Sequence, residues 1–129
     1  MTGAEWFEAY ALASGNGLTA MAILLTMVSG YMGIAFLVGE KLSTTQVAMA
    51  NSVYILAGAS VLMANYGNVL DSATARAEAS RLISEMKPIF ATGSSVDVMA
   101  FTVAGINALF IVISLIFMWQ VRHPKGRRL

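Results

Sequence analysis

The side chains of this chain that can form specific polar contacts are mostly uncharged, and they recur at regular intervals within hydrophobic stretches. Asn51, Gly58 and Asn65 are spaced by seven residues, and Asn107 and Ser114 repeat that spacing further along. Seven residues are close to two helical turns, so each set falls on one side of a helix. The amides therefore predict hydrogen bonds between packed helices, each worth ~0.6 to 2 kcal/mol in a membrane.

Residue content argues against most other chemistry. The chain has no cysteine, and its one histidine, His123, lies in a basic C-terminal tail. One chain therefore lacks the paired histidines of a haem site and the histidine that a catalytic triad would need among its helices. The nine methionines are scattered without a repeated close pair, which favours packing over copper binding. We expect no catalytic, metal or cofactor site, and no nucleic-acid partner.

The apolar stretches that carry these amides predict a membrane protein of the all-α class. Of the residues, 57% are hydrophobic and 12% charged. Charged residues are absent from three stretches: 31 residues between Glu8 and Glu40, 29 between Lys41 and Asp71, and 24 between Asp97 and Arg122. Each exceeds the ~20 residues that cross a bilayer as a helix. We expect one membrane domain over residues 1–129, with transmembrane helices at about 18–38, 46–66 and 98–118.

Two further helices are expected outside these spans. Thr2 and Glu5 have capping-box spacing, which predicts a short interfacial helix over residues 3–13, broken by the Ser-Gly-Asn-Gly run at 14–17. An apolar face between spans two and three predicts an amphipathic helix over about 72–87, ended by Pro88. The alternative is that this segment extends span two, if Gly67 and Asn68 do not break it. Only residues 39–45 join the first two spans, which predicts a tight hairpin.

Charge distribution predicts the orientation. Three spans place the termini on opposite sides, and basic residues concentrate beside the last span, so the C-terminus is expected in the cytoplasm and the N-terminus outside. Anionic lipid headgroups are the expected partners of the basic tail residues. These are Arg122, Lys125, Arg127 and Arg128.

Small and amide side chains predict the surfaces through which the helices pack. In lipid, such residues let backbones approach closely and gain dispersion contact. The predicted packing residues are Thr26, Ser29, Gly33, Asn51, Gly58, Asn65, Ala100, Ala104, Asn107 and Ala108. They form more packing surface than one three-helix chain needs, so a homo-oligomer or a larger membrane-protein complex is expected.

The first hairpin also resembles a known group of proteins. The similarity lies in Ser29, Gly30, Tyr31, Ala35, Val38, Gly39, Leu42, Gln46, Val47 and Asn51. This stretch, about a third of the chain, resembles small three-span bacterial membrane proteins of uncharacterised function. The resemblance implies a bacterial inner membrane, and it implies no activity and no functional residue.

Three functions are open to such a chain. The first is a non-catalytic scaffold, assembly or accessory subunit that acts through helix packing. The second is an oligomeric channel or uncoupled solute pathway, with a wall formed by Asn51, Tyr54, Asn65 and Asn107. The third is a hydrophobic subunit of a membrane enzyme complex that contributes a quinone or lipid pocket. Since no charged side chain lies in the central part of a span, a proton-coupled pump is disfavoured.

Overall fold

Three long helices make up the protein. The computed structural model describes residues 1–83 and 95–124, and over them it contains no strand. Helix α1 covers Gly3–Val38, α2 covers Thr44–Leu82 and α3 covers Val96–Arg122. A short 3₁₀ helix, η1 (Gly39–Lys41), lies in the tight connection between α1 and α2. The all-α class predicted from the sequence is confirmed.

Side-chain caps define where each helix begins. The Thr2 backbone N–H donates to Glu5 Oε2 at 2.6 Å, and the Glu5 N–H donates to Thr2 Oγ1, so the predicted capping box is present. Ser43 and Gln46 form a second capping box at the start of α2, and Ser95 caps α3. These contacts satisfy backbone N–H groups that have no partner within the helix.

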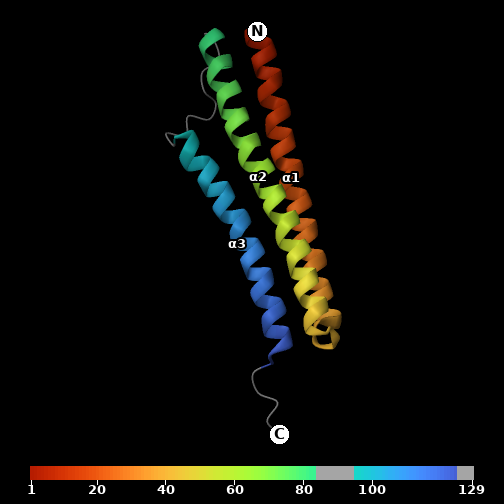
Figure 1. Cartoon of the computed structure of the whole chain (residues 1–129). Coiled ribbons are helices and arrows are strands. Elements are labelled where there is room, and N and C mark those ends of the chain that lie inside the picture. Colours follow the sequence, from red (N-terminus) through yellow and green to blue (C-terminus); the bar gives the residue numbers. More distant parts are fainter. Residues whose placement is uncertain (84–94, 125–129) are drawn as a thin grey trace.

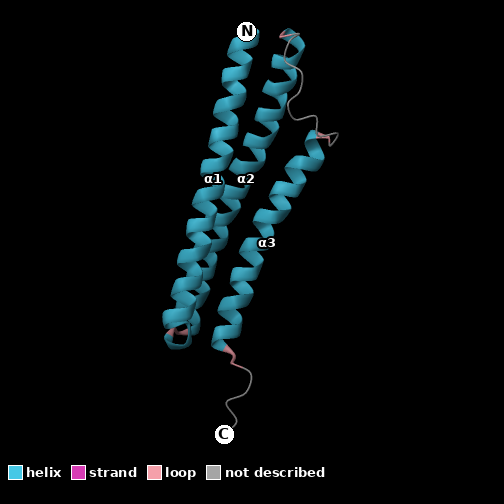
Figure 2. Cartoon of the chain, turned by 180° about the vertical axis from the view of Figure 1, so that it is seen from behind, coloured by secondary structure: helices cyan, strands magenta, loops and turns pink. Residues whose placement is uncertain are grey.

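The helices form an elongated bundle (Figure 1). Helices α1 and α2 run antiparallel side by side, and α3 lies against them at an angle. The start of α1 and the end of α3 lie at opposite ends of the bundle. Seen from behind, α1 and α2 extend past the start of α3 (Figure 2). The arrangement agrees with three consecutive antiparallel crossings of one membrane.

The expected break between an interfacial helix and the first span is wrong. Residues 14–17 continue α1 without interruption. Two glycines within a helix cost only about 1 kcal/mol each, and packing along the whole hairpin offsets this cost. At the far end of the hairpin, a Cβ on Gly3 would lie 2.5 Å from Ile83, so α1 and α2 touch even there. The separate helix over 3–13 is therefore the first part of α1.

The expected second break is also absent, and the alternative of a longer span two is confirmed. Helix α2 passes through Gly67 and Asn68 and ends at Leu82, earlier than the predicted end at Lys87. Ala75 and Ala79, on the predicted apolar face, are buried. Arg81 pairs with Glu78 at 2.8 Å. The predicted stop at Pro88 lies outside the described residues.

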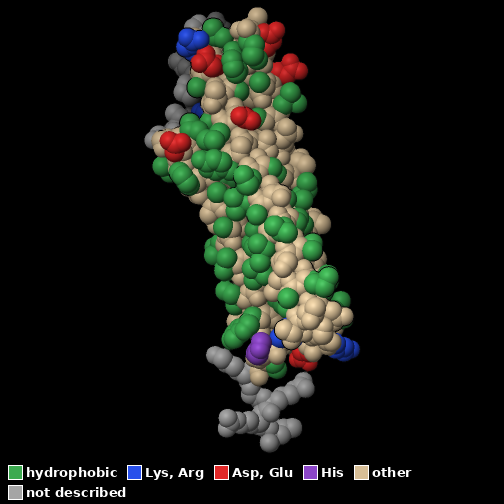
Figure 3. All heavy atoms as spheres, viewed as in Figure 1, with side chains coloured by type: hydrophobic (Ala, Val, Ile, Leu, Met, Phe, Trp, Pro, Cys, Tyr) green, Lys and Arg blue, Asp and Glu red, His purple; other side chains and the backbone are tan. Residues whose placement is uncertain are grey.

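All three helices are long and apolar enough to cross a membrane. Charged side chains gather toward the two ends of the bundle, and the visible face is free of them around its middle (Figure 3). At 1.5 Å per residue the 36 residues of α1 extend about 54 Å, against a hydrocarbon thickness of ~30 Å. The chain is thus a multi-pass membrane protein whose α1–α2 hairpin is longer than one crossing requires.

Candidate functional site

The amide stripe of α2 faces the interior of the bundle. Tyr54, Gly58 and Asn65 are buried and Asn51 is half-buried, whereas Met49, Val53 and other residues on the opposite side of α2 are exposed. The seven-residue spacing keeps these positions on one side because two helical turns take close to seven residues. The predicted polar stripe therefore faces the helices of the same chain.

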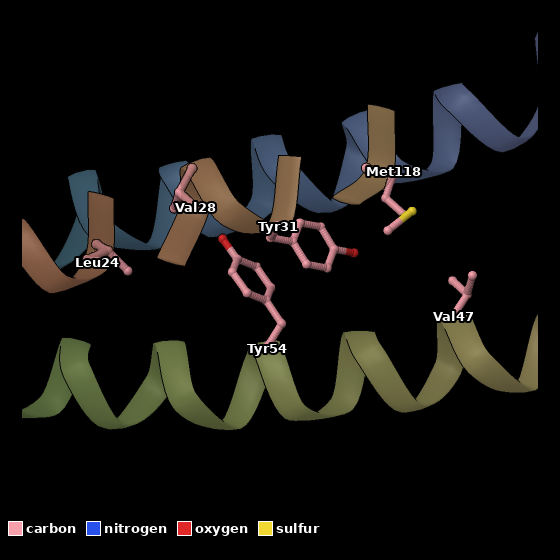
Figure 4. Close-up of a cluster of buried hydrophobic side chains, with 7 residues drawn as sticks. Leu24, Val28, Tyr31, Val47, Tyr54 and Met118 are labelled. Carbon is pink, nitrogen blue, oxygen red and sulfur yellow. The ribbon is translucent and has the colours of Figure 1, made fainter. Parts of the chain in front are cut away.

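Two tyrosines at the centre of the bundle connect all three helices. The rings of Tyr31 and Tyr54 stack with centroids 4.1 Å apart and planes 16° apart. The two side chains point toward each other from α1 and α2 (Figure 4). Such a ring pair adds about 0.5 to 1.5 kcal/mol beyond the area it buries. Leu24, Val28 and Met118 belong to the same apolar cluster.

Each tyrosine hydroxyl has a partner on a neighbouring helix. The Tyr31 hydroxyl donates to Asn51 Oδ1 at 2.5 Å, which connects α1 and α2. Ser114 Oγ donates to the Ile111 carbonyl at 2.7 Å and has only one hydrogen to give. Tyr54 Oη therefore donates to Ser114 Oγ, at 2.7 Å, which connects α2 and α3. These bonds satisfy polar groups that would be costly to leave unpaired in hydrocarbon.

Tyr31 is the member of this network that sequence reasoning missed. Its phenol lies in the middle of a stretch without charges, and a buried phenol usually has a hydrogen-bond partner. That position was the available signal. The partner itself, Asn51, is separated by a turn and lies on another helix, so the pairing depends on how α1 and α2 are aligned.

Glycines set the close contacts of α3 with the other helices. A Cβ on Gly58 would lie 2.8 Å from Ile111 Cδ1, which is closer than such atoms normally approach. A Cβ on Gly39 would lie 3.2 Å from Val121 Cγ1, near the other end of α3. Gly58 was predicted as a packing residue, and the structure places it where α2 meets α3.

Asn107 is fully buried without a hydrogen bond. Its exposed fraction is 0%, and neither the Oδ1 nor the Nδ2 atom has a partner among the described residues. The sequence predicted that this amide would bond to a neighbouring helix, and in the structure it does not. An unmade hydrogen bond of a buried amide costs about 1 to 3 kcal/mol. Asn107 therefore stands out as the polar group whose burial needs an explanation.

A groove lies between the helices in the half of the bundle that holds the N-terminus. Its volume is about 260 Å³. Ser14, Gly17 and Leu18 of α1 line it, together with Asn65 of α2 and Val103 of α3. Asn65, one of the predicted packing residues, is 3% exposed, and its side chain makes no hydrogen bond to another described residue. Val103 is one helical turn from Asn107, but Asn107 itself does not line the groove.

The small residues predicted to pack fall into two groups. On α3, Ala100 is buried and Ala104 and Ala108 are half-buried. On α1 the predicted face is exposed instead, and it points away from the rest of the chain. Its members are Thr26, Ser29 and Gly33. A Cβ on Gly33 would meet nothing within 4 Å.

At the end of the bundle near the C-terminus, Arg122 is half-buried in the last turn of α3. His123 is exposed, and its ring stacks on Trp119 with centroids 5.1 Å apart. The other predicted headgroup-binding residues lie outside the described residues: Lys125, Arg127 and Arg128. Within residues 1–83 and 95–124, no three histidine, aspartate or glutamate side chains come together to form a metal site.

Comparison with known proteins leaves this geometry as the basis for any functional argument. No family model, no curated protein and no solved structure matches the chain.

Proposed function

We propose that the protein is a non-catalytic membrane subunit that acts as a scaffold, assembly factor or accessory component by packing helices against a second copy or another membrane protein. One observation carries the proposal. After the chain has packed its own interior, α1 still presents an unoccupied face made of small residues.

This outward face of α1 follows an alternating spacing of three and four residues. Its members, all exposed, are Gly15, Thr19, Ala22, Thr26, Ser29 and Gly33. The Thr26 hydroxyl donates to the Ala22 carbonyl at 2.9 Å, and the Thr19 hydroxyl donates to the Gly15 carbonyl, so both hydroxyls are satisfied within the helix. A face of this kind lets another helix approach closely, which is how helices gain contact energy in lipid.

The interior of a single chain gives weaker support to a pore. Two of the four predicted wall residues, Asn51 and Tyr54, are held in hydrogen bonds between helices. Gly58 brings α2 against Ile111 at the same level of the bundle. These contacts support the role of the stripe in packing.

The role of the outward face can be tested by placing a large side chain on it. Gly33→Leu should lower self-association or partner recovery about tenfold, because the longer side chain holds the facing backbone away. Crosslinking in native membranes and native mass spectrometry after mild extraction measure the effect. The matched control is Phe36→Leu, an exposed position on α1 that is already large. A monomeric wild-type protein that recovers no partner contradicts the proposal.

A channel or solute pathway is the second candidate, favoured by the buried amide of Asn107, which has no partner among the described residues. In that case Asn107→Leu would change the flux of water or small solutes through reconstituted vesicles and leave assembly intact. A hydrophobic subunit of an enzyme complex is the third candidate, and partner recovery from the native membrane would identify the enzyme.

The proposed location is the bacterial inner membrane, with the C-terminus in the cytoplasm. The basic residues near the end of α3 support this orientation. The chain has no cysteine, so single cysteines can report on each side. Ala4→Cys, at an exposed position, should react with a membrane-impermeant maleimide in intact cells, and Pro124→Cys should react only after lysis. The reverse pattern would overturn the orientation.

A further inference from the structure

The groove between the three helices has the features of a binding site that the packing role does not use. Asn65 lines it and is 97% buried, yet its side-chain amide makes no hydrogen bond to any residue that the structure describes. This amide has two donor hydrogens and an acceptor oxygen. A bound molecule that supplies partners for these groups would gain affinity.

The backbone of α1 leaves the space beside this amide open. Gly17 lies opposite Asn65, and a Cβ on Gly17 would be 3.4 Å from Asn65 Oδ1. Any larger side chain at this position would extend into the groove. Gly15, two positions away on the exposed side of α1, has nothing within 4 Å of where its Cβ would lie. Gly17 therefore faces the groove, and Gly15 faces the outer surface of the same helix.

The groove is lined mostly by apolar surface, and its two serines lie at one end. Ser14, Asn68 and Ser72 lie toward the end of the bundle that holds the N-terminus, and Met21 and Val103 lie toward the middle. The sequence places the membrane boundary near residues 18 and 66, so the groove spans the transition from headgroups to hydrocarbon. None of its lining residues carries a charge.

We propose that this groove binds a lipid-soluble molecule that has an apolar chain and an uncharged polar head. The Asn65 amide, whose Oδ1 lies nearest Gly17, hydrogen-bonds to that head, and the chain leaves past Leu18 and Val103 into the bilayer. An anionic head is disfavoured, because the lining offers no base to pair with it. A volume of about 260 Å³ equals roughly nine water molecules, which suits a ring or a small head and not a whole lipid.

Two sources share this chemistry, a quinone and a neutral glycerolipid. The test uses a diazirine-labelled decyl-benzoquinone and a diazirine-labelled monooleoylglycerol, each with the full-length protein in phosphatidylcholine nanodiscs. Photocrosslinked peptides identify the site, and titration gives the half-saturating concentration. The probe that labels residues 13–21 and the facing part of α2 at the lower concentration identifies the class of the natural ligand.

Two substitutions should weaken this labelling. Asn65→Leu removes the hydrogen bond at equal side-chain size and should raise the half-saturating concentration about tenfold. Gly17→Leu fills the groove and should abolish saturable labelling. The matched controls, Asn16→Leu and Gly15→Leu, make the same two changes at exposed positions of α1 and should stay within about twofold of the wild type.

Folding is checked by helical content and by a monodisperse elution profile. If Gly17→Leu misfolds, Val103→Phe fills the groove from α3 instead. Equal labelling of both groove variants and their controls, or labelling confined to the outward face of α1, overturns the proposal. Self-association is measured separately from ligand labelling. A failure of the labelling test therefore leaves the proposed packing role intact, and a failure of the association test leaves the proposed ligand site intact.

Discussion

Replacing Gly58 with leucine is expected to destabilise the bundle by about 3 kcal/mol, the largest loss among these predictions. Even a Cβ at this position would lie 2.8 Å from Ile111 Cδ1, so a leucine pushes α2 and α3 apart. The separation would also strain the hydrogen bond between Tyr54 and Ser114, one turn away on each helix. Unfolding by steric trapping in bicelles gives the free energy directly.

The size of the substituent and its position provide the controls. Gly58→Ala should cost only about 1 kcal/mol, because the flexible end of Ile111 can move. Gly33→Leu adds the same leucine on the exposed side of α1 and should not lower the unfolding free energy of the monomer, because nothing lies within 4 Å of where its Cβ would be. If Gly58→Leu is as stable as Gly33→Leu, the close approach of α2 and α3 is incorrect.

Asn107→Leu is expected to stabilise the bundle by about 1 to 2 kcal/mol, which is unusual for a substitution in a buried interior. Leucine has the same number of side-chain heavy atoms and the same branching as asparagine, so it occupies nearly the same space. It removes two buried polar atoms that have no partner among the described residues. The same unfolding measurement in bicelles applies.

Asn51→Leu is the matched comparison, and its effect should have the opposite sign. It removes the acceptor of the Tyr31 hydroxyl and leaves that phenol unpaired, at a cost of about 1 to 2 kcal/mol. A loss of stability in Asn107→Leu as large as that in Asn51→Leu would mean that bound water satisfies the Asn107 amide. Such water would favour the pathway function over the packing function.

For assembly, these predictions separate two kinds of packing surface. Gly58 and Asn51 act within one chain, so their substitution should lower the stability of the monomer. Gly33 faces outward, so its substitution should lower association and leave the monomer intact. A complex that survives Gly33→Leu but is lost with Gly58→Leu would place the contact surface elsewhere on the bundle.

The sequence alone determined that the protein is an all-helical membrane protein with three crossings. Stretches of 24 to 31 residues without a charge leave no soluble alternative, because such helices have no polar face. The spacing of Asn51, Gly58 and Asn65 also predicted which side of α2 faces inward, since burial follows the helical period. The capping residues Thr2 and Glu5 marked the first helix start for the same local reason.

Only the tertiary structure decided how far the helices continue and which surfaces remain free. Local propensity predicted breaks at residues 14–17 and at Gly67, but packing between α1 and α2 outweighs about 1 kcal/mol per glycine. Small residues look alike in the sequence whether they face a neighbouring helix, as Gly58 does, or the exterior, as Gly33 does. The difference depends on the rotation of each helix about its own axis, which is set by contacts between residues far apart in the chain. For that reason the pairing of Tyr31 with Asn51 and the unpaired amide of Asn107 emerged only from the assembled bundle.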